Sequence, residues 1–271
     1  MRTALLLAIS TIAFAQVEDR STEHKSFSGV HELIIDNITG DIELTAYSGA
    51  SIEMDVEKTL SARSNDRLAI ARKEISLAER REGGLVELTV DGPFRCHCGD
   101  NSVHFHGDQL YRFKYTFKVR VPRAIALELH TVNGSRISVE GTAGDFHVSN
   151  VNGSIDMRDV EGAGEVHTVN GEVKVTFARN PTGATSFRSV NGTLDVAFRA
   201  NLSADLKLKT FNGGMYTDFP VTTSPVAAHP EQRDGKMIWG RNRTTAVRIG
   251  SGGPELSFDT LNGQILIRKR D

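Results

Sequence analysis

The side chains best suited to chemistry lie in one short stretch of the chain. Cys96-His97-Cys98 and His104-Phe105-His106 contain both cysteines and three of the nine histidines. Thiolate and imidazole groups in a set of four suit a tetrahedral Zn²⁺ ion or a copper ion. The spacing is tighter than in zinc fingers, so the pattern allows a metal site without requiring one.

The turn between the two motifs decides whether four ligands can share one face. Residues two apart on a strand point to the same side. In a hairpin with the loop 99–103, Cys98 lies opposite His104 and Cys96 lies opposite His106. A loop one residue shorter turns both imidazoles away from the cysteines, and the turn residues favour neither register. The longer loop predicts a Zn²⁺ site formed by these four side chains.

The same cysteines have two simpler explanations. They are the only cysteines in the chain, so an oxidising compartment favours a Cys96–Cys98 disulfide. Residues two apart on an extended strand lie near the upper limit of the Cα separation for a disulfide, and such a bridge would be strained. A polar loop without a role is the third reading.

Elsewhere the sequence does not indicate catalysis. It contains no glycine-rich phosphate loop, nucleophile elbow or His-Glu-x-x-His motif. His130 and His167 occupy equivalent positions of a repeat, but Ser149 and Arg188 occupy the same positions in other repeats, which indicates a solvated face. Four aspartates could supply the carboxylates of a glycan-cleaving enzyme, although outward aspartates are usually solvated. They are Asp145, Asp156, Asp159 and Asp195. We therefore expect a protein that is not an enzyme and has no cofactor apart from the possible Zn²⁺.

The first fifteen residues have the pattern of a signal peptide. Arg2 precedes an apolar run from Ala4 to Ala13, and Ala13-Phe14-Ala15 is a small-x-small cleavage pattern that would leave Gln16 first. The run is shorter than the roughly 20 residues that span a bilayer. The sequence predicts export to the periplasm, the cell surface or the medium, with no transmembrane segment in the mature chain.

The amino-acid composition limits the classes of partner that we expect. Lys and Arg total 32 against 34 Asp and Glu, which gives no electrostatic reason to expect nucleic acid. Hydrophobic residues make up 39% and charged residues 24%, which is typical of a packed domain. We expect the partner to be a surface or envelope component, either protein or glycan.

The N-terminal part of the mature chain reads mainly as strands. Residues 16–29 are polar and predict a frayed lead-in, whereas 32–60 alternate between apolar and polar residues. Residues 64–74 predict a short helix with a polar cap. Gly83-Gly84 predicts a hairpin turn. Strict alternation over 111–121, ended by a proline, predicts the strongest strand in the chain.

Six Asn-Gly pairs reveal an internal repeat from about residue 125 onward. They stand at 133–134, 152–153, 170–171, 191–192, 212–213 and 262–263. Four positions before each Asn the residues are apolar: Leu129, Val148, Val166, Phe187, Leu208 and Phe258. Two before, they are small and polar: Thr131, Asn150, Thr168, Ser189, Thr210 and Thr260. One before, they are apolar: Val132, Val151, Val169, Val190, Phe211 and Leu261.

A fourth column lies three positions after Asn and is also apolar. It holds Ile155, Val173, Leu194, Met215 and Ile265. The first repeat has Arg136 at this place, with Ile137 and Val139 displaced by one, which predicts an extra residue or bulge. Between the last two repeats, 219–235 predicts a surface loop, and 236–239 with 245–249 predicts a further pair of strands.

Two architectures fit the repeat. An Asn-Gly hairpin would place Val166 opposite Val175. Alternatively, each repeat is one coil of a parallel β-solenoid, with Asn-Gly at a corner that needs a positive φ. Like residues in one column favour stacking. We therefore predict an all-β chain. Residues 125–271 form a solenoid like a parallel β-helix, with the apolar columns inside, and 16–124 form an N-terminal β-rich region with the Cys/His insertion at 91–109.

At these residues the chain resembles the bacterial putative-adhesin family of β-strand repeats, the type known as domain of unknown function 4097. The resemblance covers roughly residues 30–271 and rests on the Asn-Gly repeats and on four further segments. These segments are Val121-Pro122, Leu127-Glu128-Leu129, Ile249-Gly250-Ser251-Gly252-Gly253-Pro254 and Thr260-Leu261-Asn262-Gly263-Gln264-Ile265. It implies a solenoid-like fold, export and a role in adhesion or envelope structure, and it supplies no catalytic residues.

Three classes of function follow from the sequence. The favoured one is an exported, non-catalytic β-repeat protein that acts as an adhesin or as a structural or binding module of the cell envelope. The alternative is a metal-binding or redox-sensing envelope protein that uses the Cys/His insertion. The weakest is a carbohydrate-active enzyme.

Overall fold

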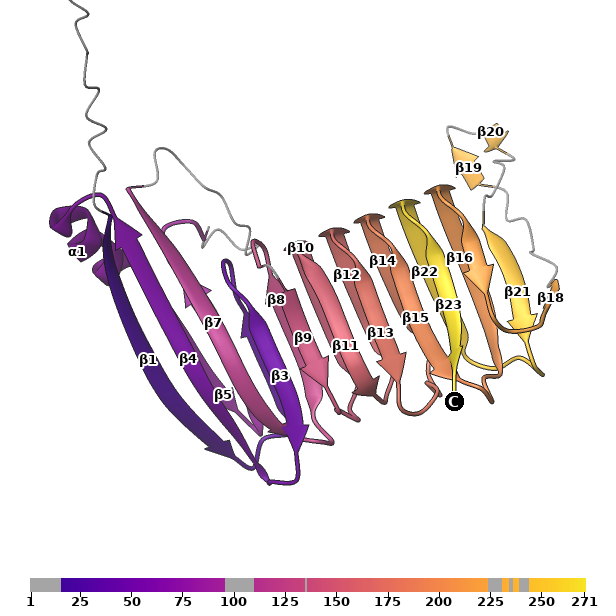
Figure 1. The fold of residues 1–271 in the computed structure, drawn as a ribbon, viewed down its shortest axis with the longest axis horizontal. Helices are drawn as coiled ribbons and strands as arrows, with labels where there is room; N and C mark the ends of the chain where they lie inside the picture. The colour runs from indigo at the N-terminus through magenta and orange to yellow at the C-terminus, as the bar shows by residue number, and fades with distance from the viewer. Residues whose placement is uncertain (1–15, 96–109, 135, 224–230, 234–235, 239–243) are drawn as a thin grey trace, which may run out of the picture.

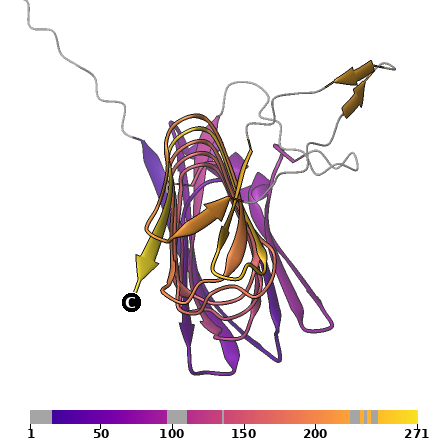
Figure 2. The ribbon, with the colours of Figure 1, turned by 90° about the vertical axis from the view of Figure 1, so that its right-hand side faces the viewer.

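The computed structural model describes residues 16–95, 110–134, 136–223, 231–233, 236–238 and 244–271. In these ranges the chain is almost entirely β, as the alternating sequence predicts. It forms two large sheets, a two-stranded sheet and one short helix. The two large sheets lie face to face, and the strands of both stack along the long axis of the molecule (Figures 1 and 2).

Sheet A contains ten strands. In spatial order they are β1 (Val17–Ser28), β4 (Ser51–Ala62), β7 (Tyr111–Pro122), β3 (Ile42–Tyr47), β9 (Arg136–Glu140), β11 (Ser154–Val160), β13 (Val173–Phe177), β15 (Leu194–Arg199), β23 (Ile265–Arg270) and β17 (Met215–Thr217).

Sheet B contains eleven strands. In spatial order they are β18 (Val221–Thr223), β21 (Thr245–Ile249), β16 (Ala204–Asn212), β22 (Glu255–Asn262), β14 (Thr185–Asn191), β12 (Gly164–Asn170), β10 (Phe146–Asn152), β8 (Ala126–Thr131), β2 (Glu32–Asp36), β6 (Leu85–Asp91) and β5 (Ser76–Glu82).

The repeat region passes alternately between the sheets, and its strands pair in parallel with the equivalent strands of neighbouring repeats. Val166 on β12 is in register with Val148 on β10 and with Phe187 on β14. Val175 pairs instead with Met157 and Val196 in the other sheet. The hairpin alternative is therefore wrong, because the residues after each Asn-Gly enter the opposite sheet.

The columns two and four positions before Asn point into the space between the sheets. Val148, Val166 and Phe187 have no exposed surface, and the small polar column is also buried except for Thr210 at the end of the stack. The prediction that all apolar columns lie inside is wrong for the column immediately before Asn. A strand alternates its faces, so that column points outward, and Phe211 is 57% exposed.

The glycines at the corners are required for a different reason from the positive φ that the sequence predicts. A corner is the place where Asn-Gly carries the chain from sheet B to sheet A. None of the six Asn-Gly glycines has a positive φ. They are required by close approach: a Cβ on Gly171 would lie 2.2 Å from the carbonyl oxygen of Gly153, and a Cβ on Gly153 only 1.8 Å from that of Gly134.

The small polar residues two positions before Asn donate hydrogen bonds to the backbone carbonyls of these closely packed corners. The side chain of Thr168 donates a hydrogen bond to the Gly153 carbonyl, at 3.0 Å, and Ser189 does the same to Gly171, at 3.2 Å. Thr260 donates to the Gly192 carbonyl, at 3.2 Å. Small hydroxyl residues recur in this buried column because each repeat must supply a donor to the corner of its neighbour.

The order of the repeats in space differs from their order in the chain. Strands β22 and β23, which come last in sequence, lie between the fourth repeat (β14 and β15) and the fifth (β16 and β17). The fifth repeat therefore ends the stack. Strand β21 then pairs antiparallel with β16 and closes sheet B, with β18 beyond it.

The excursion between these repeats departs from the prediction. The expected pair of strands does not form: β20 (Lys236–Ile238) pairs with β19 (Glu231–Arg233) in a separate sheet, while β21 joins sheet B. The first repeat does contain the extra residue expected from the sequence. Ile137, four residues after Asn133, is in register with Ile155, three residues after Asn152.

The N-terminal region continues the same two sheets. Asn37-Ile38-Thr39-Gly40 forms an additional corner, where Thr39 is bridged to Asn133 in parallel and Gly40 has a φ of +120°. Strands β2 and β3 on either side of it pair in parallel with β8 and β9. The domain boundary at 124/125 stays a prediction, and both large sheets contain strands from either side of it.

Three local predictions in this region can be compared with the structure. Residues 17–28 form the edge strand β1, paired along its whole length with β4, so the expected frayed lead-in is wrong. Its charged side chains are typical of an exposed sheet edge. Helix α1 (Asn65–Glu74) is confirmed, with Ser64 as its N-cap. The hairpin at Gly83 and Gly84 is also confirmed, and both glycines have positive φ.

Candidate binding pocket

The sequence-predicted metal site lies outside the described residues. Cys96, Cys98, His104 and His106 fall within 96–109, so the structure does not test the metal, disulfide and loop readings. Within the described ranges, no group of three or more His, Cys, Asp or Glu side chains is placed to hold a metal ion.

The four aspartates proposed as carboxylates have structural partners in the fold. Asp156 is paired with Arg158, Asp159 with Arg270 at 2.7 Å, and Asp195 with Arg268 at 2.7 Å. Asp145 accepts a hydrogen bond from the Ala163 amide, at 3.0 Å. Asp145 and Asp195 are engaged by a neighbouring repeat and Asp156 by its own strand. All four carboxylates therefore have structural partners, and this arrangement does not resemble the facing pair of a glycosidase.

The column containing His130 and His167 lies on the outer face of sheet B. His130 Nδ1 and Ser149 Oγ are 2.7 Å apart, on the adjacent strands β8 and β10. Burial lowers the pKa of His130 below its ordinary value, and the same cause lowers the pKa of His167. The expectation of a fully solvated face is too simple, because stacking leaves both imidazoles partly buried.

Asp36 is level with His130 on the neighbouring strand β2, so this row places Asp, His and Ser side by side. Asp36 is held by Arg95, whose guanidinium is 2.7 Å from the carboxylate. Ser149 lies in a regular strand that pairs with both neighbouring strands, whereas a nucleophile elbow lies on a sharp turn. Its partner is the Nδ1 atom of His130, which in a Ser-His-Asp triad is the nitrogen that binds the aspartate. The row therefore has triad residues without triad geometry.

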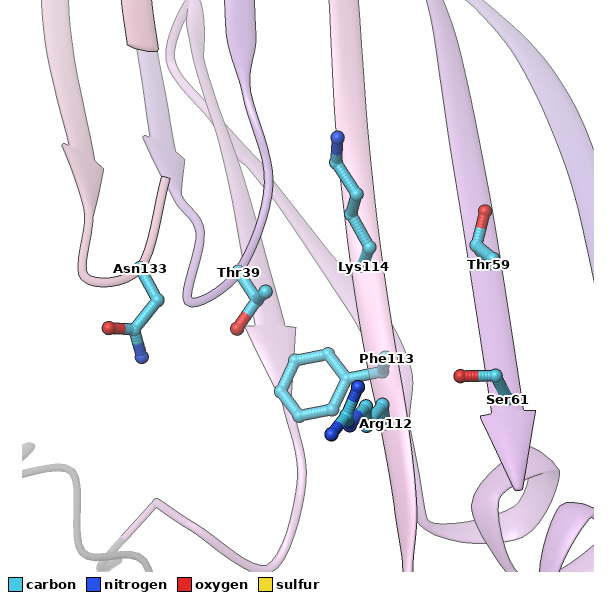
Figure 3. A pocket seen from close by; sticks show the side chains of 7 residues that line it. All are labelled: Thr39, Thr59, Ser61, Arg112, Phe113, Lys114 and Asn133. Carbon is cyan, nitrogen blue, oxygen red and sulfur yellow. The ribbon is translucent and has the colours of Figure 1, made fainter. Parts of the chain in front are cut away.

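A pocket formed by described residues lies where β7 extends past the corner at Thr39. It has a volume of about 570 Å³ and is open to solvent. We call it the corner pocket; its lining is Thr39, Thr59, Ser61, Arg112, Phe113, Lys114 and Asn133 (Figure 3).

The elements around the corner pocket explain how these residues meet. Strand β7 is twelve residues long, and β3 covers only its second half, from Phe117 onward. Residues 111–114 of β7 pair with no described strand other than β4, and there Ser61 is opposite Arg112 and Thr59 is opposite Lys114. The two corners at Thr39 and Asn133 therefore face an uncovered length of strand.

The floor of the pocket is aromatic. Figure 3 shows the ring of Phe113 projecting from β7 toward the corner residues Thr39 and Asn133. The ring is held by Phe94, with the two ring centroids 5.0 Å apart and an interplanar angle of 14°. The backbone is fixed at the same place, because the Tyr115 amide donates to the Thr39 carbonyl at 2.8 Å.

The polar side chains of the pocket are basic or neutral. Lys114 is partly neutralised by Asp41, 3.0 Å from its Nζ atom. Arg112 forms no ion pair with any residue in the described part of the chain, and its side chain is exposed. Three hydroxyls and the Asn133 amide complete the lining. The pocket thus combines an apolar surface, hydrogen-bonding groups and an unneutralised guanidinium.

A second, smaller hollow of about 320 Å³ lies on the outer face of sheet B near the last two repeats in space. We call it the sheet-B groove; its lining includes His167, Arg188, Val190, Lys209, Phe211, Asp259 and Leu261. Lys209 and Asp259 form an ion pair at 3.0 Å, whereas Arg188 forms no ion pair with any described residue. Its exposed apolar residues belong to the outward column immediately before Asn.

Little in the amino-acid sequence indicates the corner pocket. Thr39 and Asn133 were recognisable as turn residues, and Arg112 and Lys114 as the outward face of a strand. Thr59 and Ser61 carried no signal. Only the pairing of β4 with β7, and of the corner at Thr39 with the corner at Asn133, places these residues around one space.

Comparison with known proteins returns solved structures alone. No model of a protein family matches the chain, and no curated protein is significantly similar to it. The chain is similar to a putative cell adhesion protein from Clostridium sporogenes, at 11% identity and a TM-score of 0.42, covering 93% of this chain and 100% of that one.

Two further structures are similar over the same share of this chain. One is a putative adhesin from Bacteroides fragilis, at 9% identity, with 97% of that chain covered and a TM-score of 0.30. The other is a putative lipid binding protein from Parabacteroides distasonis, at 15% identity, with 97% of that chain covered and a TM-score of 0.30. These names describe those two proteins.

Proposed function

We propose that this protein is an exported, non-catalytic β-solenoid of the putative-adhesin type, and that it binds an acidic saccharide of a cell surface or envelope in the corner pocket. The observation that carries the proposal is the lining of that pocket. Its lining contains the partly buried ring of Phe113, the guanidinium of Arg112, which forms no ion pair with a described residue, and the polar side chains of Thr39, Ser61 and Asn133.

Each part of the lining matches a part of such a ligand. A pyranose ring has an apolar C–H face that packs on an aromatic ring, while its hydroxyls exchange hydrogen bonds with Ser, Thr and Asn side chains. A sugar carboxylate pairs with a guanidinium through two parallel hydrogen bonds. A few placed polar groups around an apolar surface are the usual composition of a small-ligand site.

The fold supports a binding role and export. The parallel register, the alternation between sheets and the recurring corners support a solenoid, whose stacked repeats form extended rigid surfaces. The first fifteen residues support export. No helix in the described part of the chain is long and apolar enough to cross a membrane. The engaged aspartates and the incomplete triad geometry support a non-catalytic role.

Calorimetric titration tests the proposal, with oligogalacturonate as the acidic probe and a neutral cello-oligosaccharide of the same length beside it. The protein should bind the acidic probe, and Arg112→Gln should weaken this binding about tenfold, because a charged hydrogen bond contributes roughly 1.5–3 kcal/mol. Lys118→Gln changes a cation on the outward face of the same strand, outside the pocket, and should leave the affinity unchanged.

Two outcomes would contradict the proposal. One is equal affinity for the acidic and neutral probes, and the other is binding that survives Arg112→Gln. Ser61→Ala provides a milder second variant, since it removes one hydroxyl from the opposite wall without changing charge. Melting curves of all three variants should overlay that of the unchanged protein, because these side chains are at the surface.

A further inference from the structure

The six Asn-Gly pairs carry a reactivity of their own. The backbone nitrogen of the glycine can attack the Cγ atom of the asparagine side chain, forming a succinimide ring and releasing the amide as ammonia. Water then opens the ring to aspartate or isoaspartate. Glycine favours this reaction because it has no side chain to hinder the approach. All six sites share the reactive Asn-Gly dipeptide, so we expect large differences in rate to come mainly from the fold.

The asparagine side chains form a continuous ladder along the corners. In spatial order it contains Asn133, Asn152, Asn170, Asn191, Asn262 and Asn212. Each Nδ2 donates to the Oδ1 of the asparagine before it in this order, at 2.7–3.0 Å. We call this array the asparagine ladder.

The four interior members are held by three hydrogen bonds each. At Asn170, for example, Nδ2 donates to Asn152, Oδ1 accepts from Asn191, and the following Gly171 amide donates to the Asn191 carbonyl at 3.0 Å. The nucleophile, the electrophile and the leaving group of the reaction are therefore all engaged. Reaction requires these bonds to open first.

Asn212 differs because it is the end of the ladder. Its Nδ2 donates to Asn262, at 2.7 Å, but no described residue donates to its Oδ1. Among the described residues the Gly213 amide also has no acceptor, and both Asn212 and Gly213 are exposed. Strand β21 covers β16 only from Ala204 to Leu208, so Asn212 lies beyond the covered part.

We propose that Asn212-Gly213 is a site of spontaneous deamidation and isoaspartate formation, and that stacking protects the four interior Asn-Gly pairs. The Gly213 nitrogen bonds to Asn212 Cγ, ammonia leaves, and one water molecule completes the conversion. The product places an acidic group where the Asn212 amide donates to Asn262. The hydrogen bond between Asn212 and Asn262 is then lost, and the terminal repeat is modified before the rest of the stack.

Peptide mapping tests this within one molecule. Trypsin cuts after Lys and Arg and leaves each Asn-Gly in its own peptide, with Asn212 in 210–233 and Asn191 in 189–199. The protein is incubated at mildly alkaline pH, and conversion of amide to acid in each peptide is followed by mass spectrometry. We expect Asn212 to react at least about tenfold faster than each interior asparagine, which corresponds to about 1.4 kcal/mol.

A denatured sample provides the control. In concentrated urea the six rates should lie much closer together, because the contacts that distinguish the sites in the fold are lost. A native protein in which Asn212 reacts no faster than Asn152, Asn170, Asn191 and Asn262 would overturn the proposal.

A ladder variant gives an independent test. Asn191→Ser removes the donor to Asn170 and the acceptor of Asn262, while leaving the contacts of Asn152 in place. Deamidation should rise at Asn170 and Asn262 and stay unchanged at Asn152. Unchanged rates at all three would show that the ladder does not protect the interior.

Discussion

The hydroxyl of Thr168 donates a hydrogen bond to the carbonyl oxygen of Gly153, 3.0 Å away in the neighbouring repeat. Both groups lie at the edge of the apolar interior, and Thr168 is completely buried. The contact joins two columns that look unrelated in the sequence. The corner glycine allows the backbones of neighbouring repeats to approach closely. The small polar residue donates the hydrogen bond that the glycine carbonyl would accept from water in a single, unstacked repeat.

Replacing Thr168 with Val should therefore lower the free energy of unfolding by about 1–3 kcal/mol, because the shape is kept while a buried carbonyl loses its donor. Chemical denaturation followed by circular dichroism measures the change. Thr193→Val is the matched control, since Thr193 is only partly buried and its side chain makes no hydrogen bond within the described structure. Equal effects of the two changes would contradict this role.

Gly171→Ala should destabilise the stack by more than an ordinary surface change, because the new Cβ would lie 2.2 Å from a backbone oxygen. We expect a loss of about 1–3 kcal/mol, as in other cases of overpacking. Gly183→Ala makes the same change where the nearest atom is the Ala163 side chain, at 3.0 Å, and should cost less. Denaturation midpoints of the two variants decide the comparison.

Val166→Asp should unfold the repeat region. Val166 has no exposed surface, and an unpaired buried charge costs several kcal/mol against a total stability of about 5–15 kcal/mol. Val169→Asp introduces the same residue three positions later on the outward column, and should leave the protein folded. A melting temperature that responds equally to both changes would show that the two columns do not face opposite sides.

Acidification should destabilise the protein partly through His130. Burial lowers its pKa in the folded state, so above the ordinary value the imidazole is neutral in both states and contributes no difference. As the pH falls through the ordinary value of about 6.5, the unfolded chain binds a proton first and folding becomes less favourable. His130→Asn should reduce the loss of stability between pH 7.5 and 5.5. An unchanged loss would exclude this contribution.

The Cys/His stretch supplies a prediction that rests on the sequence alone. If the loop 99–103 sets the register, the reduced protein should bind Zn²⁺ through Cys96, Cys98, His104 and His106. Calorimetry should then show zinc binding that is lost in the double change His104→Ala with His106→Ala and is kept in His97→Ala. Zinc affinity that survives the double change rules out this ligand set.

Much of the architecture could be predicted because it depends on local periodicity. Alternation over Tyr111–Pro122 and the column containing Val166 predicted strands and their buried faces, since a strand repeats every two residues. The capped helix after Ser64 and the Gly83-Gly84 turn depend on neighbouring residues alone. The prediction of a frayed lead-in is wrong for 17–28 because an edge strand can be polar on both faces and still pair along its length.

The sequence by itself determined that the chain is almost entirely β, that it is built from repeats, and which residue types recur at each corner. Only the tertiary structure decided that the last repeat lies between the fourth and fifth, that Phe211 and Leu261 face outward, and that Asn212 ends the ladder. Only it brought Thr39, Arg112 and Asn133 to one pocket. The physical reason is that a residue pattern sets the face and period of each strand, whereas the choice of neighbour depends on contacts between segments far apart in the chain.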